Sequence, residues 1–178
     1  MVVGFFILGL LAYRTYMAHP PVPQRVVDAQ GRVLYTGKDI SKGQQVFPHN
    51  GLMEYGSAFG HGAYLGPDFT ADYLRRASDL VARTYGGAAS DSAARRTIAD
   101  FRTNHYDKKT GTLTVSAAQT RAFGVLVAHY GAFFSDPKTE HGLRPNAITD
   151  RTQLRQLTAF FAWTAWAAST NRPGHDYS

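Results

Sequence analysis

The chain has 178 residues, of which 44% are hydrophobic and 13% aromatic, so it is long and apolar enough to bury the core of one globular domain. Its formal net charge is +6 at pH 7, but the basic residues are scattered along the sequence, which argues against a nucleic-acid partner. The lack of cysteine excludes disulfide bonds, thiolate metal sites, a cysteine nucleophile and thioether-linked haem.

The chain begins with an uninterrupted apolar run over residues 1–13, whereas a complete membrane crossing needs about 20 such residues. A secretory signal peptide could have an apolar stretch of this length, but neither a basic start nor a small-residue cleavage site is clear. We therefore expect residues 1–18 to be the C-terminal part of a transmembrane helix. The proline-rich residues 19–25 then form an extended linker, and residues 26–178 form one domain.

Short β-prone and helical signals follow the linker. Two β-prone runs within residues 25–35 flank the turn-forming residues 28–31, which predicts a hairpin. Residues 36–39 and 41–44 both fit a helix-capping box, so a short helix is expected to begin between them and to extend up to Pro48.

Beyond residue 69, apolar residues recur at steps of three and four, which predicts helices. The first helix is expected to be capped by Thr70 and stopped by the glycine pair 86–87. The second opens at Asp91, and the residues that it is expected to bury are Ala94, Ile98 and Phe101. A turn at residues 107–111 then leads into the β-prone run 113–115, which indicates a second hairpin.

Two more helices follow. One begins at the capping box of residues 116–119, and its apolar side consists of Phe123, Leu126, Val127, Tyr130, Phe133 and Phe134. The other is capped at Thr149 or Asp150, and the spacing of Trp163 and Trp166 within it indicates packing instead of a cofactor site. The elements together predict a mainly α-helical domain with small β-hairpins and an N-terminal hydrophobic helix.

A stretch rich in glycine and aromatic residues, 51–69, connects the short helix to the first long one. Its five glycines allow the backbone to take positive φ angles or to approach a partner closely, and its four aromatic residues can anchor it. Two interpretations stay open for this stretch. It is either a glycine-rich turn over the core or an ordered functional loop.

The residues alone predict no catalytic or metal centre. The seven histidines are spread along the chain without an i, i+4 pair or a His-Glu-x-x-His arrangement. No nucleophile elbow, Walker loop or dinucleotide fingerprint occurs. We interpret His129 and Tyr130 as hydrogen-bonded polar groups of the core, not as ligands.

Four stretches carry a family resemblance: residues 36–47, 51–57, 60–71 and 161–174. They closely resemble the N-terminal part of quinol-dependent nitric oxide reductases, and the similarity covers nearly the whole chain. In that family a first transmembrane helix precedes an extracytoplasmic domain with a cytochrome c-like fold. A bundle of membrane helices follows, with haem b and a non-haem iron at which NO becomes N2O. The resemblance implies part of an oxidoreductase of the bacterial cell membrane, with this domain on the periplasmic side and no catalytic centre in it.

The resemblance also bears on haem. In the related two-subunit enzymes the small subunit is a true cytochrome c, whose Cys-x-x-Cys-His motif precedes a Gly-x-Gly-Ala-Tyr segment. Aligning that segment on residues 60–64 places Leu52, Tyr55 and Gly56 at the positions of the two cysteines and the histidine ligand. The resemblance thus implies a cytochrome c-like fold that lacks haem, in which Tyr55, Phe59 and other aromatic side chains fill the vacated volume. No cofactor is expected in this segment.

Two functions are compatible with these features. The first is a structural and interface domain that caps the catalytic transmembrane bundle of the same polypeptide, with quinol as electron donor, in denitrification or NO detoxification. This function implies an interface loop formed by Gly60, His61, Gly62, Ala63, Tyr64, Gly66, Pro67 and Asp68. The alternative is a free-standing, membrane-tethered binding module derived from a cytochrome c.

Overall fold

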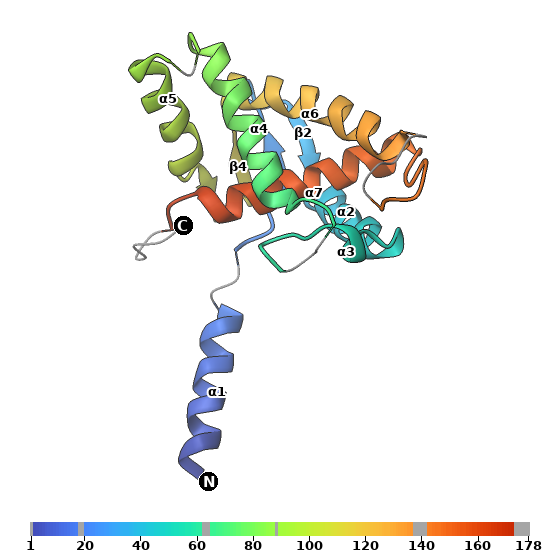
Figure 1. Ribbon diagram of the computed structural model, residues 1–178. Coiled ribbons are helices and arrows are strands. Elements are labelled where there is room, and N and C mark those ends of the chain that lie inside the picture. Colours follow the sequence, from blue (N-terminus) through green and yellow to red (C-terminus); the bar gives the residue numbers. More distant parts are fainter. Residues whose placement is uncertain (1, 18–19, 62–64, 88, 137–141, 173–178) are drawn as a thin grey trace.

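The computed structural model describes residues 2–17, 20–61, 65–87, 89–136 and 142–172. Within them the chain forms seven helices and four short strands (Figure 1). In chain order these elements are α1 (Val2–Met17), β1 (Arg25–Val27), β2 (Val33–Thr36), α2 (Gly37–His49), α3 (Leu52–Tyr55), α4 (Phe69–Thr84), α5 (Asp91–Arg102), β3 (Tyr106–Asp107), β4 (Thr112–Thr114), α6 (Ala117–Ser135) and α7 (Arg151–Ser169). The prediction of a mainly helical domain with small β-hairpins is confirmed.

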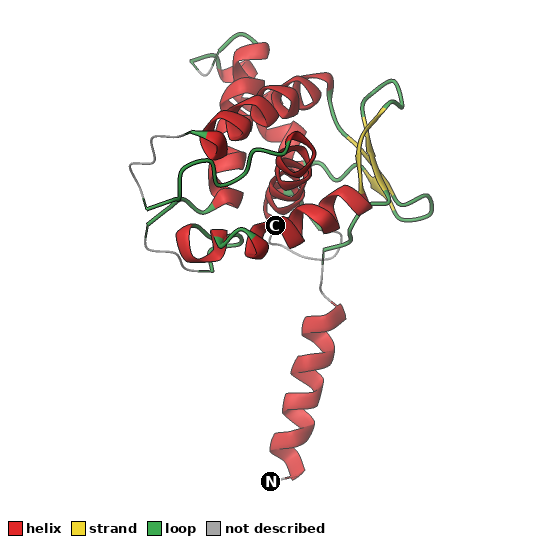
Figure 2. Ribbon diagram, turned by 90° about the vertical axis from the view of Figure 1, so that its right-hand side faces the viewer, coloured by secondary structure: helices red, strands yellow, loops and turns green. Residues whose placement is uncertain are grey.

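Helix α1 projects from the rest of the molecule (Figures 1 and 2). Its large apolar side chains are exposed, from 45% for Leu10 to 83% for Val2. The helix has 16 residues, and none of the described helices is both long and apolar enough to cross a membrane. The expected transmembrane segment at residues 1–18 therefore stays a prediction.

The two predicted hairpins form, and they join into one sheet with the strand order β2-β1-β4-β3, which lies at the side of the helices (Figure 2). Strands β1 and β2 pair antiparallel, as do β3 and β4. Strands β1 and β4 pair parallel, with Val26 opposite Leu113, and both of these side chains are buried. The second hairpin is thus part of the core packing through Leu113.

Helix α2 begins at the earlier of the two predicted capping boxes. Thr36 and Asp39 exchange bonds: the Thr36 amide donates to Asp39 Oδ2 at 2.9 Å and the Asp39 amide donates to Thr36 Oγ1 at 3.3 Å. Ser41 consequently lies inside the helix, and Pro48 lies at its last turn. Helix α2 packs very closely on α7, because a Cβ atom on Gly43 would lie 2.0 Å from the carbonyl oxygen of Gln156.

Helices α4 and α5 differ from their predictions in detail. Asp68, not Thr70, caps α4, since its Oδ1 accepts a bond from the Ala71 amide at 2.9 Å. The predicted stop at residues 86–87 is confirmed, with positive φ angles at both glycines. On α5 the predicted buried face is confirmed only for Phe101, which is partly buried against the core. The buried residues are the small Ala93 and Thr97, which allow close packing, whereas Ile98 is 60% exposed.

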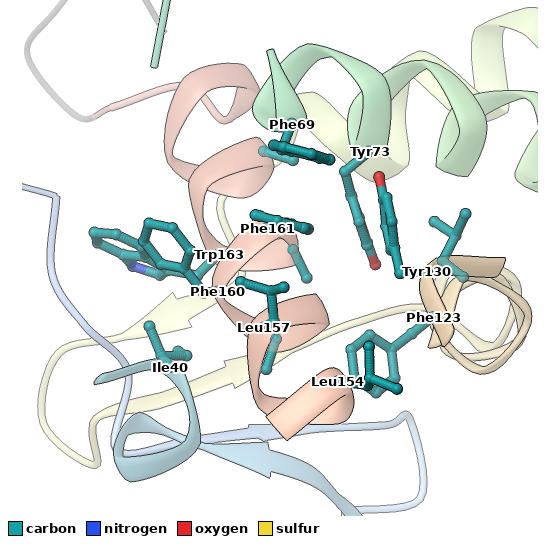
Figure 3. Close-up of a cluster of buried hydrophobic side chains, with 14 of the residues drawn as sticks. Ile40, Phe69, Tyr73, Phe123, Tyr130, Leu154, Leu157, Phe160, Phe161 and Trp163 are labelled. Carbon is teal, nitrogen blue, oxygen red and sulfur yellow. The ribbon is translucent and has the colours of Figure 1, made fainter. Parts of the chain in front are cut away.

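Helices α6 and α7 form the centre of the core. The predicted capping box of α6 is confirmed, because the amides of Ser116 and Gln119 each bond to the other residue's side chain. Asp150 caps α7 through a bond from the Gln153 amide. Helix α7 is buried on nearly every side and packs against α2, α4 and α6 (Figures 1 and 3).

Candidate functional site

Aromatic rings fill the interior around α7. Phe69, the first residue of α4, is fully buried and stacks on Phe161 of α7, with 4.6 Å between ring centroids and 2° between ring planes (Figure 3). Among the described residues, the further rings within 6.5 Å of Phe69 are those of Phe47, Tyr55, Tyr130, Phe133 and Phe134. We call these seven residues the aromatic cluster.

Of the three residues that the family resemblance places at haem-attachment positions, Tyr55 belongs to this cluster, Leu52 shares its hydrophobic core and Gly56 lies against Phe69. Leu52 is fully buried, and Tyr55 is 5% exposed, with its ring 6.3 Å from that of Phe133. A Cβ atom on Gly56 would lie 2.4 Å from the Phe69 ring. The prediction that Tyr55 occupies the interior is confirmed. The same prediction for Phe59 is wrong, because Phe59 is 41% exposed at the surface.

These residues do not fit a haem. None of the side chains at positions 52, 55 and 56 can form a thioether bond. Tyr55 is the only residue type among them that ligates haem iron in proteins, and burial raises its pKa, which disfavours the phenolate that would bind the metal. The pocket between the sheet and the helices, lined by Tyr35, Tyr73 and Trp166, has about 50 Å³. Sites for small organic ligands are usually roughly 300–1,000 Å³, so this interior pocket is too small for a haem. Nor do three His, Asp or Glu side chains of the described ranges come close enough together to hold a metal ion.

Asp68 holds the interface loop against the start of α4. Its Oδ2 accepts bonds from Ser57 Oγ at 2.8 Å and from the Gly60 amide at 2.7 Å, while its Oδ1 caps the helix. Thr70 supports the same turn, since its hydroxyl accepts a bond from the Phe59 amide at 3.0 Å. One carboxylate thus joins the two ends of the loop, and glycine at position 60 provides the positive φ of 75°.

The other end of the loop is tied to α3. The Gly66 amide donates to the Tyr55 carbonyl oxygen at 2.6 Å, and the Ser57 amide donates to the Pro67 carbonyl oxygen at 3.1 Å. A Cβ atom on Gly66 would lie 2.6 Å from the Tyr55 ring, so only glycine allows this approach. His61 is exposed. The predicted loop residues Gly62, Ala63 and Tyr64 lie outside the described residues.

Two surface pockets border α3 and the loop. One, of about 230 Å³, is lined by Met53, His61 and Phe160 among others. The other, of about 430 Å³, is lined by residues that include Leu65 and Arg144. Leu65 is 63% exposed and Met53 is 61% exposed. Leu65 within the loop stretch and Met53 on α3 therefore present apolar side chains at this surface.

The polar groups on α6 have different environments. Burial and the neighbouring Asp72 carboxylate raise the pKa of Tyr130, whose hydroxyl donates to Asp72 Oδ2 at 3.0 Å. The interpretation of Tyr130 as a hydrogen-bonded core group is confirmed. It is wrong for His129, because Nε2 of that residue is buried without a partner among the described atoms. Burial and the charge of Arg76 lower the pKa of His129.

Sequence reasoning missed one contact beside the loop. The indole Nε1–H of Trp163 donates to the Pro21 carbonyl oxygen at 3.0 Å, and the Phe59 ring meets the Trp163 ring edge-on at 5.9 Å. Trp163 and Pro21 are 142 positions apart. No local pattern indicates such a contact, although the buried tryptophan itself could be expected to find a partner for its N–H group.

Comparison with protein families places this geometry in context. Residues 23–178 match the NorB cytochrome c-like family, which is the cytochrome c-like domain of nitric oxide reductase. The comparison with curated proteins finds no significant match.

Proposed function

Because the chain belongs to the NorB cytochrome c-like family of nitric oxide reductase domains, we propose that it is the structural and interface domain of a quinol-dependent nitric oxide reductase. In this proposal the domain lies on the periplasmic side of a bacterial cell membrane. It caps a catalytic transmembrane bundle of the same polypeptide, which contains haem b and non-haem iron and converts NO to N2O with electrons from quinol.

The observation that carries the proposal is the aromatic cluster. The resemblance aligns Leu52, Tyr55 and Gly56 with the haem-attachment positions of a cytochrome c. Stacked rings such as those of Phe69 and Phe161 fill the interior next to these three residues. Such an interior is suited to rigidity and not to electron transfer by a bound haem. The domain therefore contributes to the enzyme through its surface.

The interface loop is the part of that surface best suited to a contact. In both ribbon views α3 and the described part of the loop lie at the end of the body from which α1 projects (Figures 1 and 2). If α1 enters the membrane, this end faces the membrane and the catalytic bundle. The loop is fixed from both sides by Asp68 and Tyr55, and it exposes the apolar side chain of Leu65.

The test uses the whole enzyme, with the domain and the catalytic bundle in one polypeptide. Leu65→Asp places a charge on the loop, and Ile98→Asp places one on α5, where the original side chain is similarly exposed (63% and 60%). We expect Leu65→Asp to lower NO consumption about tenfold, because an unpaired charge in a packed contact costs about 1–3 kcal/mol or more. Ile98→Asp is expected to retain activity.

Haem content and thermal midpoint of both variants serve as folding controls. Full NO consumption in Leu65→Asp would refute the contact. Equal loss in the two variants would show a general effect of surface charge and would count against the interface loop as well.

A further inference from the structure

The segment that follows α1 is packed against the body. We call its described part, residues 20–24, the tether. The Gln24 amide donates to the Gly111 carbonyl oxygen at 2.8 Å, and the Gly37 amide donates to the Gln24 carbonyl oxygen at 3.0 Å. Pro23 is buried, and a Cβ atom on Gly37 would lie 2.5 Å from its carbonyl oxygen. The tether is therefore part of the folded domain and has little freedom to move alone.

Trp163 lies between the tether and the loop. Its side chain points toward the tether in Figure 3. Its Nε1–H group donates a hydrogen bond to the Pro21 carbonyl oxygen at 3.0 Å. The exposed fraction of Trp163 is only 9%. The Phe59 ring approaches it at 89°, the edge-to-face geometry that aromatic pairs favour. One side chain thus contacts two segments that are far apart in sequence.

Phe59 has a backbone conformation that needs support from its surroundings. Its φ angle is +57°, in the left-handed region that bulky residues rarely adopt. Such a conformation persists only where neighbouring contacts determine it, and here these are the bond of its amide to Thr70 and the contact of its ring with Trp163. The next residue, Gly60, starts the interface loop and bonds to Asp68.

We propose that Trp163 is a positioning residue, which fixes the start of the interface loop, at Phe59 and Gly60, relative to the tether of α1 by acting through Phe59. The hydrogen bond to Pro21 fixes the plane of the indole ring, and this plane determines where the Phe59 ring and the start of the loop lie. A displacement of the tether is then transmitted to the loop. An effect of this coupling on NO reduction rests on the proposed function. The coupling between the tether and the loop does not depend on that function.

Amide hydrogen exchange of the whole 178-residue chain in lipid nanodiscs, measured by NMR, tests the proposal. Trp163→Phe removes the N–H donor and keeps an aromatic ring. The amides that report on the two segments and on the rest of the fold are Gln24 and Gly37 for the tether, Phe59 and Gly60 for the loop, and Val115 for the sheet, where it bonds to Val27. We expect the tether and loop amides to exchange roughly two- to tenfold faster, as after the loss of one hydrogen bond, with Val115 unchanged.

Trp166→Phe is the matched control. Trp166 lies one turn further along α7, and its Nε1 is buried without a hydrogen-bond partner among the described atoms. Its ring contacts that of Tyr106 on β3, which belongs neither to the tether nor to the loop. This variant is expected to leave the tether and loop amides at their wild-type exchange rates.

Coupling is reciprocal, so a perturbation from the loop side must reach the indole. Phe59→Ala changes a side chain that is 41% exposed and does not open the core. We expect it to accelerate exchange of the Trp163 Nε1–H at least twofold. If Trp163→Phe also accelerates exchange of the Val115 amide, it destabilises the whole domain. In that case Phe59→Ala alone tests the coupling between Trp163 and the loop.

Unchanged loop amides in a folded Trp163→Phe variant would overturn the proposal, as would unchanged indole exchange in Phe59→Ala or equal acceleration in Trp166→Phe. None of these measurements involves NO or the catalytic bundle. The proposal on Trp163 and the proposed function can therefore fail separately.

Discussion

Phe69 and Phe161 stack face to face, with ring centroids 4.6 Å apart and ring planes within 2° of parallel. Both side chains are fully buried, so truncation of either removes contacts on all sides. We expect Phe161→Ala to lower the free energy of unfolding by about 3–5 kcal/mol, the usual effect of such a cavity. Val125→Ala on α6, where the side chain is 51% exposed, is the control and should change it by about 0.5 kcal/mol or less. Urea denaturation measures both, and similar values for the two variants would contradict a filled interior.

The close crossing of α2 and α7 depends on a glycine, Gly43, which has no side chain. A Cβ atom on Gly43 would lie 2.0 Å from the Gln156 carbonyl oxygen, and a helix backbone cannot move aside alone. Gly43→Ala should therefore destabilise the domain by about 1–3 kcal/mol through overpacking. Gly124→Ala on α6 has open space around the new atom and should stabilise it by about 0.5–1 kcal/mol. Thermal denaturation shows whether each substitution raises or lowers the thermal midpoint. A raised midpoint in both variants would refute the close crossing of α2 and α7.

Asp68 has a larger role than an ordinary helix cap. Its carboxylate binds Ser57 and Gly60 in addition to the amide at the start of α4. Asp68→Ala should cost about 1–3 kcal/mol and should accelerate hydrogen exchange of the Gly60 amide. Asp150→Ala, which removes the cap of α7, is the control and should leave that amide unaffected. Protection of Gly60 in Asp68→Ala would mean that other contacts hold the loop.

His129 gives the stability a pH dependence. Burial, aided by repulsion from Arg76, lowers its pKa in the folded chain below the ordinary 6.5, despite attraction by Asp72. As pH falls below 6.5, the unfolded chain takes up a proton that the folded chain binds less readily, so the free energy of unfolding decreases. His129→Phe should reduce this decrease between about pH 7 and pH 5. Urea denaturation at several pH values measures the free energy of unfolding. The same pH dependence of this free energy in wild type and variant would contradict the role of His129.

Local signals in the sequence predicted the helices well, since capping boxes such as Thr36 with Asp39 lie within one turn. Contacts between distant residues could not be predicted in this way. The parallel pairing of Val26 with Leu113 and the bond from Trp163 to Pro21 leave no local pattern. The sequence does not identify Asp68 as the cap of α4, because Thr70 is also a common capping residue, and only the bond from the Ala71 amide to Asp68 Oδ1 distinguishes the two.

For the site, the sequence predicted a loop rich in glycine and aromatic residues, but not which rings fill the interior. Tyr55 was expected inside and is buried there, whereas Phe59 lies at the surface because its neighbour Trp163 offers a ring contact beside the tether. The buried face of α5 was assigned from apolar periodicity. The structure partly buries Phe101 as this periodicity predicts, but it also buries the small residues Ala93 and Thr97 and leaves Ile98 exposed.

The haem content of the chain tests the central claim most directly, namely that this cytochrome c-like domain acts through its architecture. The chain is expressed together with a c-type haem maturation system, purified, and then also mixed with free haemin. We predict a pyridine haemochrome spectrum without c-type haem and no tightly bound haemin. The reason is that no thiol is available, and the aromatic cluster around Phe69 and Phe161 occupies the interior. One haem per chain, either covalent or tightly bound, would contradict the account.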